Sequence, residues 1–184
     1  RGGMGEVWRG TDETGAAVAI KTLQPQFAAD PGVVQRFVAE RHLLTSARDP
    51  HVVRVRDLVA EGSTLAIVMD LVEGTDLRAD LSRRGTLASA EACLLGAQIA
   101  RGLAAIHAAR IVHRDVKPEN VLLDQTINPP RALRTDFGVS KLLEESPDRL
   151  RATVVAGTPL YLAPELALGA PPDPRADIYS LGIV

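Results

Sequence analysis

The sequence is short of several residues and patterns, and each shortage excludes something. A single cysteine in 184 residues, Cys93, rules out an internal disulfide framework and is typical of a reducing compartment such as the cytoplasm. Cys93 lies in an apolar pattern with helical spacing, so we expect a buried, structural thiol. No run of about 18 apolar residues occurs, which leaves no predicted membrane span. No signal peptide opens the chain.

Strong charge of either sign is also missing. The net charge is −2, so the composition gives no support to nucleic acid or a membrane surface as the main partner. With 46% hydrophobic residues, the composition is that of an ordinary globular domain, long enough to bury a sizeable core. Three lysines stand against 18 arginines. Where arginine is the usual cation, a lysine marks a site that needs a compact ammonium on a slim stem.

Chemically useful side chains are concentrated in two short stretches. These are His-Arg-Asp-Val-Lys-Pro-Glu-Asn at 113–120 and Asp-Phe-Gly at 136–138. Proline and glycine interrupt them, which predicts loops. Asp115 can accept or orient a hydroxyl proton, and Lys117 can neutralise an anion. Asn120 and Asp136 offer the hard oxygen ligands that Mg²⁺ takes beside the phosphates of a substrate.

Hydrophobic spacing predicts the elements around these stretches. Short or alternating apolar runs predict β-strands at 2–9, 16–23, 51–59, 63–72 and 121–123. Apolar residues at helical spacing predict helices at 32–46 and 86–110. In the second helix the residues that share one face are Leu95, Ile99, Gly102, Leu103 and Ile106. Its polar residues Gln98 and His107 receive no role.

The first predicted helix carries an acid on its apolar stripe. Val33, Phe37 and Leu44 lie on one face, and Glu40 falls on the same stripe. A carboxylate facing the core needs a partner, and Lys21, at the end of a predicted strand, is the natural one. Taken alone, Glu40 is equally well explained as a residue at the stripe edge, and Lys21 as a lysine that reaches solvent.

Seven motifs follow one another in the order found in protein kinases, and the chain resembles that family from residue 2 to residue 177. They are the glycine-rich loop at 2–7, Val-Ala-Ile-Lys at 18–21, the helix glutamate at 40, His-Arg-Asp with its asparagine at 113–120, Asp-Phe-Gly at 136–138, Ala-Pro-Glu at 163–165 and the aspartate at 177. Lys117, with Thr158 before Ala-Pro-Glu, resembles the Ser/Thr branch. Gly-Gly-Met-Gly-Glu-Val and the composition rich in alanine and arginine resemble the bacterial, eukaryotic-like (Hanks-type) group.

The resemblance implies an α+β, bilobal protein-kinase-like fold. Residues 1–72 would form an N-lobe, a small antiparallel β-sheet with helix C, and residues 73–184 a mainly α-helical C-lobe. Both ends look truncated, because the N-lobe would lack its first strand and the C-lobe its C-terminal helices. We therefore expect the isolated piece to be unstable or inactive. A membrane anchor elsewhere in the parent protein and a kinase-domain dimer stay open, with the kinase domain itself expected in the cytoplasm.

The resemblance also implies a nucleotide site. ATP with Mg²⁺ or Mn²⁺ would bind between the lobes, and Lys21, fixed by Glu40, would hold its α- and β-phosphates. The remaining contacts would come from Gly2 and Gly5 in the glycine loop, Val7 over the base, Ala19 against the adenine, Met69 as gatekeeper, backbone groups of Asp70 and Val72 in the hinge, and Leu122 below the base.

The implied reaction is transfer of the ATP γ-phosphoryl group to serine or threonine hydroxyls of proteins. Asp115 would orient the hydroxyl and take its proton, while Lys117 stabilises the γ-phosphate. The metal ligands would be Asn120 and Asp136. Asp177 would begin the buried helix that anchors the backbone of the catalytic loop.

Residues 139–162 have the composition of an activation segment, and we expect autophosphorylation there. A phosphate on Thr153 would pair with Arg114 and order the segment. The stretch Arg134-Thr135, just before Asp-Phe-Gly, is more polar than the family pattern. The resemblance therefore does not predict how these two side chains pack.

Two other functions fit parts of the pattern. One is a pseudokinase, an ATP-binding scaffold without transfer activity, which the complete set of chemical residues argues against. The other is transfer to a small molecule on a related fold. Residues 157–165, which resemble a peptide-binding floor, favour a protein substrate instead.

Overall fold

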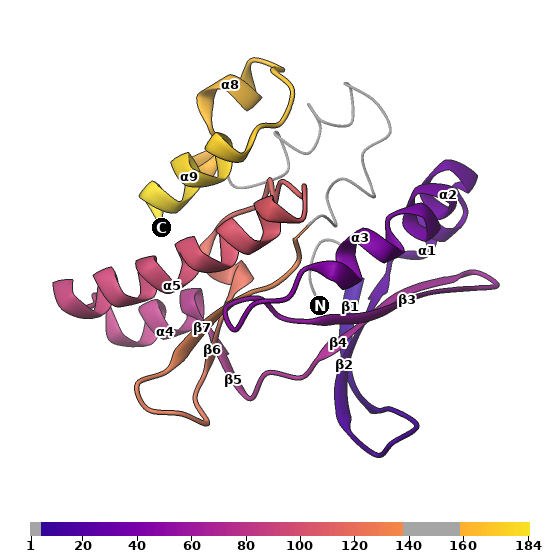
Figure 1. Ribbon diagram of the computed structural model, residues 1–184, viewed down its shortest axis with the longest axis horizontal. Coiled ribbons are helices and arrows are strands. Elements are labelled where there is room, and N and C mark those ends of the chain that lie inside the picture. The colour runs from indigo at the N-terminus through magenta and orange to yellow at the C-terminus, as the bar shows by residue number, and fades with distance from the viewer. Residues whose placement is uncertain (1–4, 138–158) are drawn as a thin grey trace.

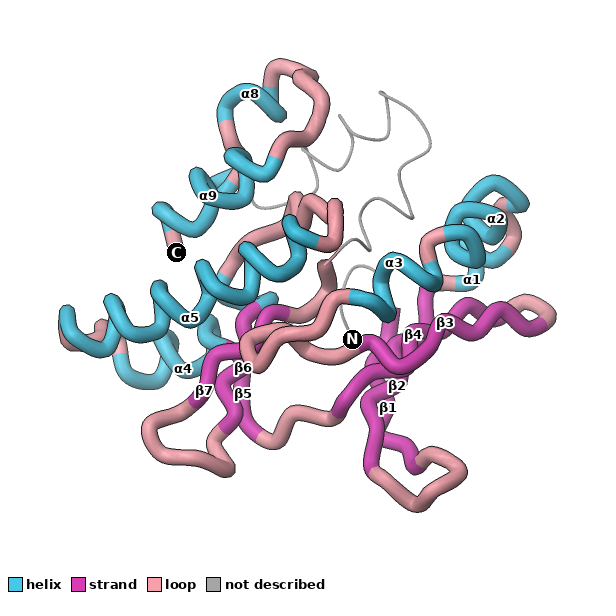
Figure 2. The backbone as a smooth tube through the Cα atoms, in the orientation of Figure 1, coloured by secondary structure: helices cyan, strands magenta, loops and turns pink. Residues whose placement is uncertain are grey.

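Two antiparallel sheets carry the fold. The structure is a computed structural model that describes residues 5–137 and 159–184. The first sheet has the order β1-β2-β4-β3, with strands β1 (Gly5–Thr11), β2 (Ala17–Leu23), β3 (Val55–Glu61) and β4 (Thr64–Asp70). The second has the order β5-β6-β7, with strands β5 (Gly74–Asp76), β6 (Val121–Asp124) and β7 (Arg131–Arg134). Figure 2 shows the loop between β4 and β5 that joins them.

Side-chain and backbone hydrogen bonds close the hairpin between the strands predicted at 2–9 and 16–23. The Asp12 side chain accepts hydrogen bonds from the backbone N–H groups of Thr14 at 2.8 Å and Ala16 at 3.0 Å. Gly15 then takes φ 85°, a left-handed conformation that costs glycine little. The hairpin sets the register that places Val7 opposite Lys21.

Three helices pack on the first sheet, namely α1 (Pro25–Ala28), α2 (Pro31–Ala39) and α3 (Arg41–Ser46). The prediction of one helix over 32–46 is corrected to two, which meet at Glu40. Asp30 caps α2 by accepting from Gly32 N and Val33 N. The predicted apolar stripe is confirmed, because Val33 and Phe37 are fully buried and Leu44 is nearly so.

Helices α4 (Leu77–Arg84) and α5 (Ser89–Ala108) pack against the second sheet (Figure 1). The remaining elements are the helices α8 (Pro164–Ala167) and α9 (Pro174–Ile183) and the short 3₁₀ turns η1 (Pro118–Asn120) and η2 (Pro159–Tyr161). Helix α5 lies between the β6–β7 part of the sheet and α9. The five apolar residues predicted to share one face of α5 are all buried.

The expectation of a buried Cys93 is wrong. The thiol is exposed near the start of α5, and the next residue, Leu94, is 44% exposed. Cys93 stands two positions before Leu95, the first buried residue of the helix, and two positions rotate a helix by about 200°. The cysteine therefore points away from the stripe that packs on the sheet.

One apolar cluster joins the two sheets. It combines side chains of β2, β3, β4, α2 and α3 with Ile106 of α5, Leu133 of β7 and Phe137. Burial of such a cluster is the main favourable term in folding. Within the described part of the chain, no helix is long and apolar enough to cross a membrane.

Candidate active site

The loop after α5 is held by one buried carboxylate. Asp177 of α9 is 1% exposed, and its two oxygens accept from the backbone N–H groups of His113 and Arg114, each at 2.8 Å. The same carboxylate lies 2.7 Å from Nε2 of His107. Arg114 takes φ 67°, an uncommon conformation for a residue with a side chain, and the anchor holds it there. The predicted anchoring role of Asp177 is confirmed, and His107 is a partner that the sequence did not reveal.

The side chains of Asp115, Lys117 and Asn120 meet in the loop that Asp177 anchors. Lys117 Nζ lies 2.8 and 2.7 Å from the two carboxylate oxygens of Asp115. Asn120 Nδ2 donates to the Asp115 backbone oxygen and to its Oδ2, both at 2.8 Å. Pro118 opens the 3₁₀ turn that brings Asn120 back toward Asp115. The Asp115 carboxylate is thus fixed in direction and faces a compact positive charge.

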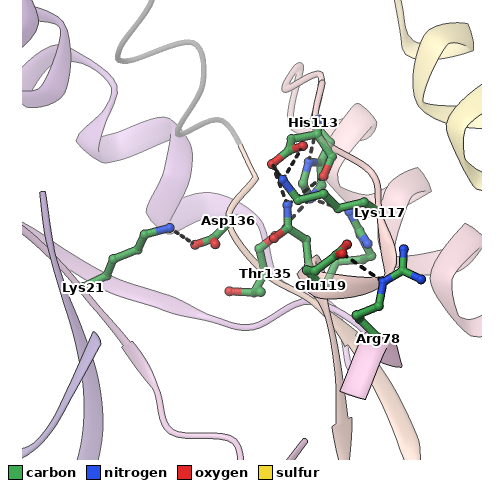
Figure 3. A network of polar contacts seen from close by, with 10 residues as sticks. Lys21, Arg78, His113, Lys117, Glu119, Thr135 and Asp136 are labelled. Atoms are coloured by element: carbon green, nitrogen blue, oxygen red, sulfur yellow. Dashed lines mark hydrogen bonds and ion pairs between the residues drawn. The ribbon is translucent and has the colours of Figure 1, made fainter. Parts of the chain in front are cut away.

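A second pair forms between the two sheets. Lys21 Nζ of β2 lies 2.7 Å from Oδ1 of Asp136, and the two side chains are 8% and 24% exposed. Figure 3 shows Lys21 extending from its strand toward Asp136. Asp136 takes φ 61°, a second strained backbone position at this site. In this structure the carboxylate next to Lys21 is that of Asp136, whereas the sequence predicts Glu40. Glu40 stands half-buried at the junction of α2 and α3.

Thr135 links the two groups of side chains. Its backbone N–H donates to the Asn120 backbone oxygen at 3.2 Å, and its own backbone oxygen lies 3.0 Å from Nε2 of His113. These contacts hold the residue before Asp136 against the loop that carries Asp115. The structure therefore brings Lys21, Asp115, Lys117, Asn120 and Asp136 into one connected region.

The residues predicted to surround a base meet in the apolar cluster described above. Ala19 and Met69 face each other across the β2–β4 register and are 8% and 7% exposed. Val72 and Leu122 pack against the same cluster from the connecting segment and from β6. Val7 is 62% exposed on β1. The set thus combines buried apolar side chains with one that is exposed.

At the start of the connecting segment, Asp70 already has partners for its backbone N–H and its side chain. The Asp70 N–H donates to the Arg54 backbone oxygen at 3.0 Å, and the Asp70 side chain accepts from Arg56 Nε at 2.6 Å. Contacts to a base from Asp70 would therefore have to use its backbone oxygen. Val72 follows where the chain leaves the first sheet.

Gly5 allows β1 to lie close against β2. It takes φ 150°, and a Cβ atom on this residue would lie 1.9 Å from the Thr22 backbone oxygen. No side chain fits there, so glycine is required for the strand pairing itself. Four other predicted positions fall outside the described residues. They are Gly2, Gly138, Thr153 and Thr158.

The donor set fits a magnesium ion shared with phosphates. Asn120 and Asp136 supply one amide and one carboxylate, and Mg²⁺ usually takes one or two such ligands together with phosphate oxygens and water. No cluster of three or more His, Cys, Asp or Glu side chains that could hold a metal alone occurs in the described residues. The chemistry of the site therefore suits a metal that arrives with a nucleotide.

The whole chain, residues 1–184, matches the family model described as the protein kinase domain. The chain belongs to the protein kinase family. Similar curated proteins include the serine/threonine-protein kinase PkaB of Streptomyces coelicolor, 53% identical over 100% of this chain and 45% of that protein. The serine/threonine-protein kinase PknA of Mycobacterium tuberculosis is 40% identical over 100% of this chain and 43% of its own length.

This kinase also resembles solved structures. The crystal structure of the Mycobacterium tuberculosis PknI kinase domain matches with a TM-score of 0.79 and 32% identity, over 98% of this chain and 67% of that one. The predicted family and the bilobal α+β fold are confirmed. The chain spans less than half the length of the curated relatives named above.

Proposed function

We propose that this kinase transfers the γ-phosphate of ATP to serine and threonine hydroxyls of proteins, in bacterial signalling. One observation carries the proposal. The Asp115 carboxylate is held by Lys117 and Asn120 and is connected through Thr135 to the Lys21–Asp136 pair. A proton acceptor, two ammonium groups and two hard oxygen ligands thus occupy one region, as phosphoryl transfer requires.

Asp115 would orient the attacking hydroxyl and accept its proton. Its carboxylate is 31% exposed, so a substrate can reach it, yet its direction is set by Lys117. Lys117 would balance the negative charge that gathers on the transferred group. Phosphoryl transfer depends on positioning and charge neutralisation more than on covalent chemistry, so this geometry supplies the main requirement.

Asn120 and Asp136 would hold Mg²⁺ or Mn²⁺, which supplies positive charge against the phosphate oxygens when bound. Lys21 would hold the α- and β-phosphates. Lys21 and a metal would then compete for the Asp136 carboxylate, because Lys21 contacts it at 2.7 Å. Glu40 as the partner of Lys21 in the nucleotide-bound protein stays a prediction.

The apolar cluster around Ala19 and Met69 would enclose the adenine. Leu122 would close it from below, and Val72 would supply a backbone contact at the connection between the sheets. Val7 and the glycines at 2 and 5 would cover the nucleotide. The 62% exposure of Val7 supports this role, since an exposed apolar side chain gains from a base placed against it.

A protein substrate is favoured over a small alcohol by contacts of the segment before α8. The Tyr161 hydroxyl accepts from Arg78 Nη2 of α4, and the Tyr161 backbone oxygen accepts from Ser180 Oγ of α9 at 2.6 Å. Arg78 also donates from Nε to Glu119 at 2.9 Å, beside the metal ligand Asn120. A segment fixed in this way gives a peptide chain a defined surface next to the reacting groups.

The test is transfer of radiolabelled γ-phosphate from ATP to a generic protein substrate, with small alcohols offered in parallel. Labelling of serine and threonine in the protein is the expected result. ATP binding without any transfer would make the protein a scaffold of the pseudokinase type. Faster transfer to the alcohols would make it a small-molecule phosphotransferase.

The kinase domain is proposed to act in the cytoplasm, where ATP is available. A membrane anchor elsewhere in the parent protein, a kinase-domain dimer and autophosphorylation near Thr153 stay predictions.

A further inference from the structure

A cation lies in the interior between the catalytic and metal loops. Arg134 ends β7 and is 0% exposed. Its backbone N–H donates to the His51 oxygen and its backbone oxygen accepts from the Val53 N–H, both at 2.8 Å. These bonds fix the strand so that the side chain must point inward. The guanidinium Nη2 lies 2.7 Å from Nε2 of His113.

Arg134 is a costly residue to bury. In the described residues, the Nε and Nη1 atoms of its guanidinium have no hydrogen-bond partner. A buried charged group with unmade hydrogen bonds destabilises the folded protein. The guanidinium keeps its positive charge, because arginine is not deprotonated in proteins.

Packing on the opposite side makes room for this side chain. A Cβ atom at Gly102 of α5 would lie 3.2 Å from Arg134 Cγ and 2.5 Å from the His51 backbone oxygen. The helix can approach β7 only because residue 102 has no side chain. The aliphatic part of the Arg134 side chain thus packs closely against α5 at Gly102. This packing keeps the guanidinium directed at His113.

His113 cannot satisfy all its neighbours in one tautomer. A guanidinium only donates, so Nε2 must accept from Arg134 and the ring proton must sit on Nδ1. The 3.0 Å contact of Nε2 with the Thr135 oxygen and the 3.4 Å contact of Asp115 N with Nδ1 would both need the opposite tautomer. The contact with Arg134 is shorter and charge-assisted, so it prevails.

The charge state of the ring agrees with this arrangement. Burial, and then the positive charge of Arg134, lower the pKa of His113 well below its usual value. The ring is therefore neutral, and one of its nitrogens can accept a hydrogen bond. A protonated ring would place two cations in contact inside the protein.

We propose that Arg134 is a positioning residue that fixes the tautomer and orientation of His113, and through it the relative placement of Asp115 and Asp136. Asp115 follows His113 by two residues, and Asp136 follows Arg134 by two, so the contact ties the two loops together near their reacting groups. The effect on catalysis rests on the proposed function. The tautomer does not, and it can be measured in a protein without activity.

The experiment compares the full-length protein with Arg134→Met and Arg134→Lys. Methionine keeps much of the volume and removes the donor, while lysine keeps a donor. Nitrogen-15 NMR of histidine-labelled protein reads the tautomer, with His113 assigned through a His113→Gln variant. The expected wild-type ring carries its proton on Nδ1, and Arg134→Met shifts it to Nε2, where it can donate to Thr135.

Kinetics and stability complete the test. We expect Arg134→Met to lower kcat about 10- to 100-fold, as loss of a supporting contact does, with KM for ATP changed less than about threefold. The midpoint temperature of thermal unfolding should stay the same or rise, because methionine removes the buried N–H groups that have no acceptor. Arg134→Lys should restore most of the kcat and keep the wild-type tautomer.

Three results would overturn the proposal. They are a wild-type ring protonated on Nε2, an Arg134→Met protein with unchanged tautomer and kcat, and an Arg134→Met protein whose only defect is a lower thermal midpoint. If the methionine variant does not fold, the position of the ring proton on His113 in the wild-type protein still decides whether the proposal holds. A wild type that shows the expected tautomer but transfers no phosphate would overturn the proposed function and leave the assignment of the ring intact.

Discussion

Lys21 Nζ lies 2.7 Å from Asp136 Oδ1, across the junction of the two sheets. The pair links the first sheet to the loop after β7. Under the proposed function, a nucleotide that binds with its metal would exchange this contact, because Asp136 would turn to the metal and Lys21 to phosphate oxygens.

Replacing Lys21 by methionine removes the cation but keeps an apolar stem. We expect phosphate transfer to fall at least about 100-fold, because a buried positive group directed at developing charge contributes on that scale. The measurement is initial rate with saturating ATP and protein substrate. Arg41→Met is the matched control, since Arg41 forms an exposed ion pair with Asp57 and should keep its rate within about twofold. Equal losses in the two variants would contradict the role of Lys21.

Acid should destabilise the fold through His113. Burial lowers its pKa in the folded protein below 6.5, so the unfolded chain takes up the proton first as the pH falls. This contribution to stability is complete above pH 6.5 and declines as the pH drops toward the folded pKa. One extra bound proton gives a slope of about 1.4 kcal/mol per pH unit at most.

Urea unfolding between pH 7.5 and 5 measures that slope. The His113→Phe variant keeps a ring of similar size and lacks the titrating group, so its free energy of unfolding should fall less steeply below pH 6.5. Parallel curves for the wild type and the variant would show that His113 does not carry the effect.

Arg78 is expected to matter for the protein substrate and not for ATP. Its side chain joins α4 to Glu119 and to the Tyr161 hydroxyl. Arg78→Ala should free the segment before α8 and raise KM for the protein substrate several-fold, with KM for ATP unchanged. Tyr161→Phe removes only one of the two contacts and should give a smaller rise. A change confined to KM for ATP would refute this account.

Loss of the buried anchor should cost stability. Asp177→Ala leaves the N–H groups of His113 and Arg114 without an acceptor in the interior. We expect the free energy of unfolding to drop by about 2–4 kcal/mol, which is usual when one member of a buried charged network is removed. Asp173→Ala, which removes an exposed cap of the same helix, should have a clearly smaller effect. Chemical denaturation of both variants makes the comparison.

Short-range patterns let the sequence predict much of the fold. The hairpin turn at Asp12 and Gly15 depends on side-chain bonds two and four residues away. The buried stripes of α2, α3 and α5 follow from helical spacing alone. Both kinds of signal lie within one turn or one helix, so no knowledge of the remaining chain is needed.

Contacts between distant segments were harder to predict. The partner of Lys21 was expected on the nearby helix at Glu40, whereas the carboxylate came from Asp136. Strand β7 was missed because it directs Arg134 inward, and an arginine does not mark a core position. His107 contacts Asp177, and Gln98 accepts from the Ala132 N–H. Hydrophobic spacing along a helix does not predict either contact.

The central claim is that Asp115 accepts the substrate proton in a site completed by Lys21, Asn120 and Asp136. The most direct test is single-turnover transfer of γ-phosphate by full-length Asp115→Asn protein, with nucleotide binding measured in the same sample. A general base contributes about 10²- to 10⁴-fold, so we predict a rate lowered at least about 100-fold with ATP affinity unchanged within about threefold. Transfer at the wild-type rate by Asp115→Asn would contradict the account.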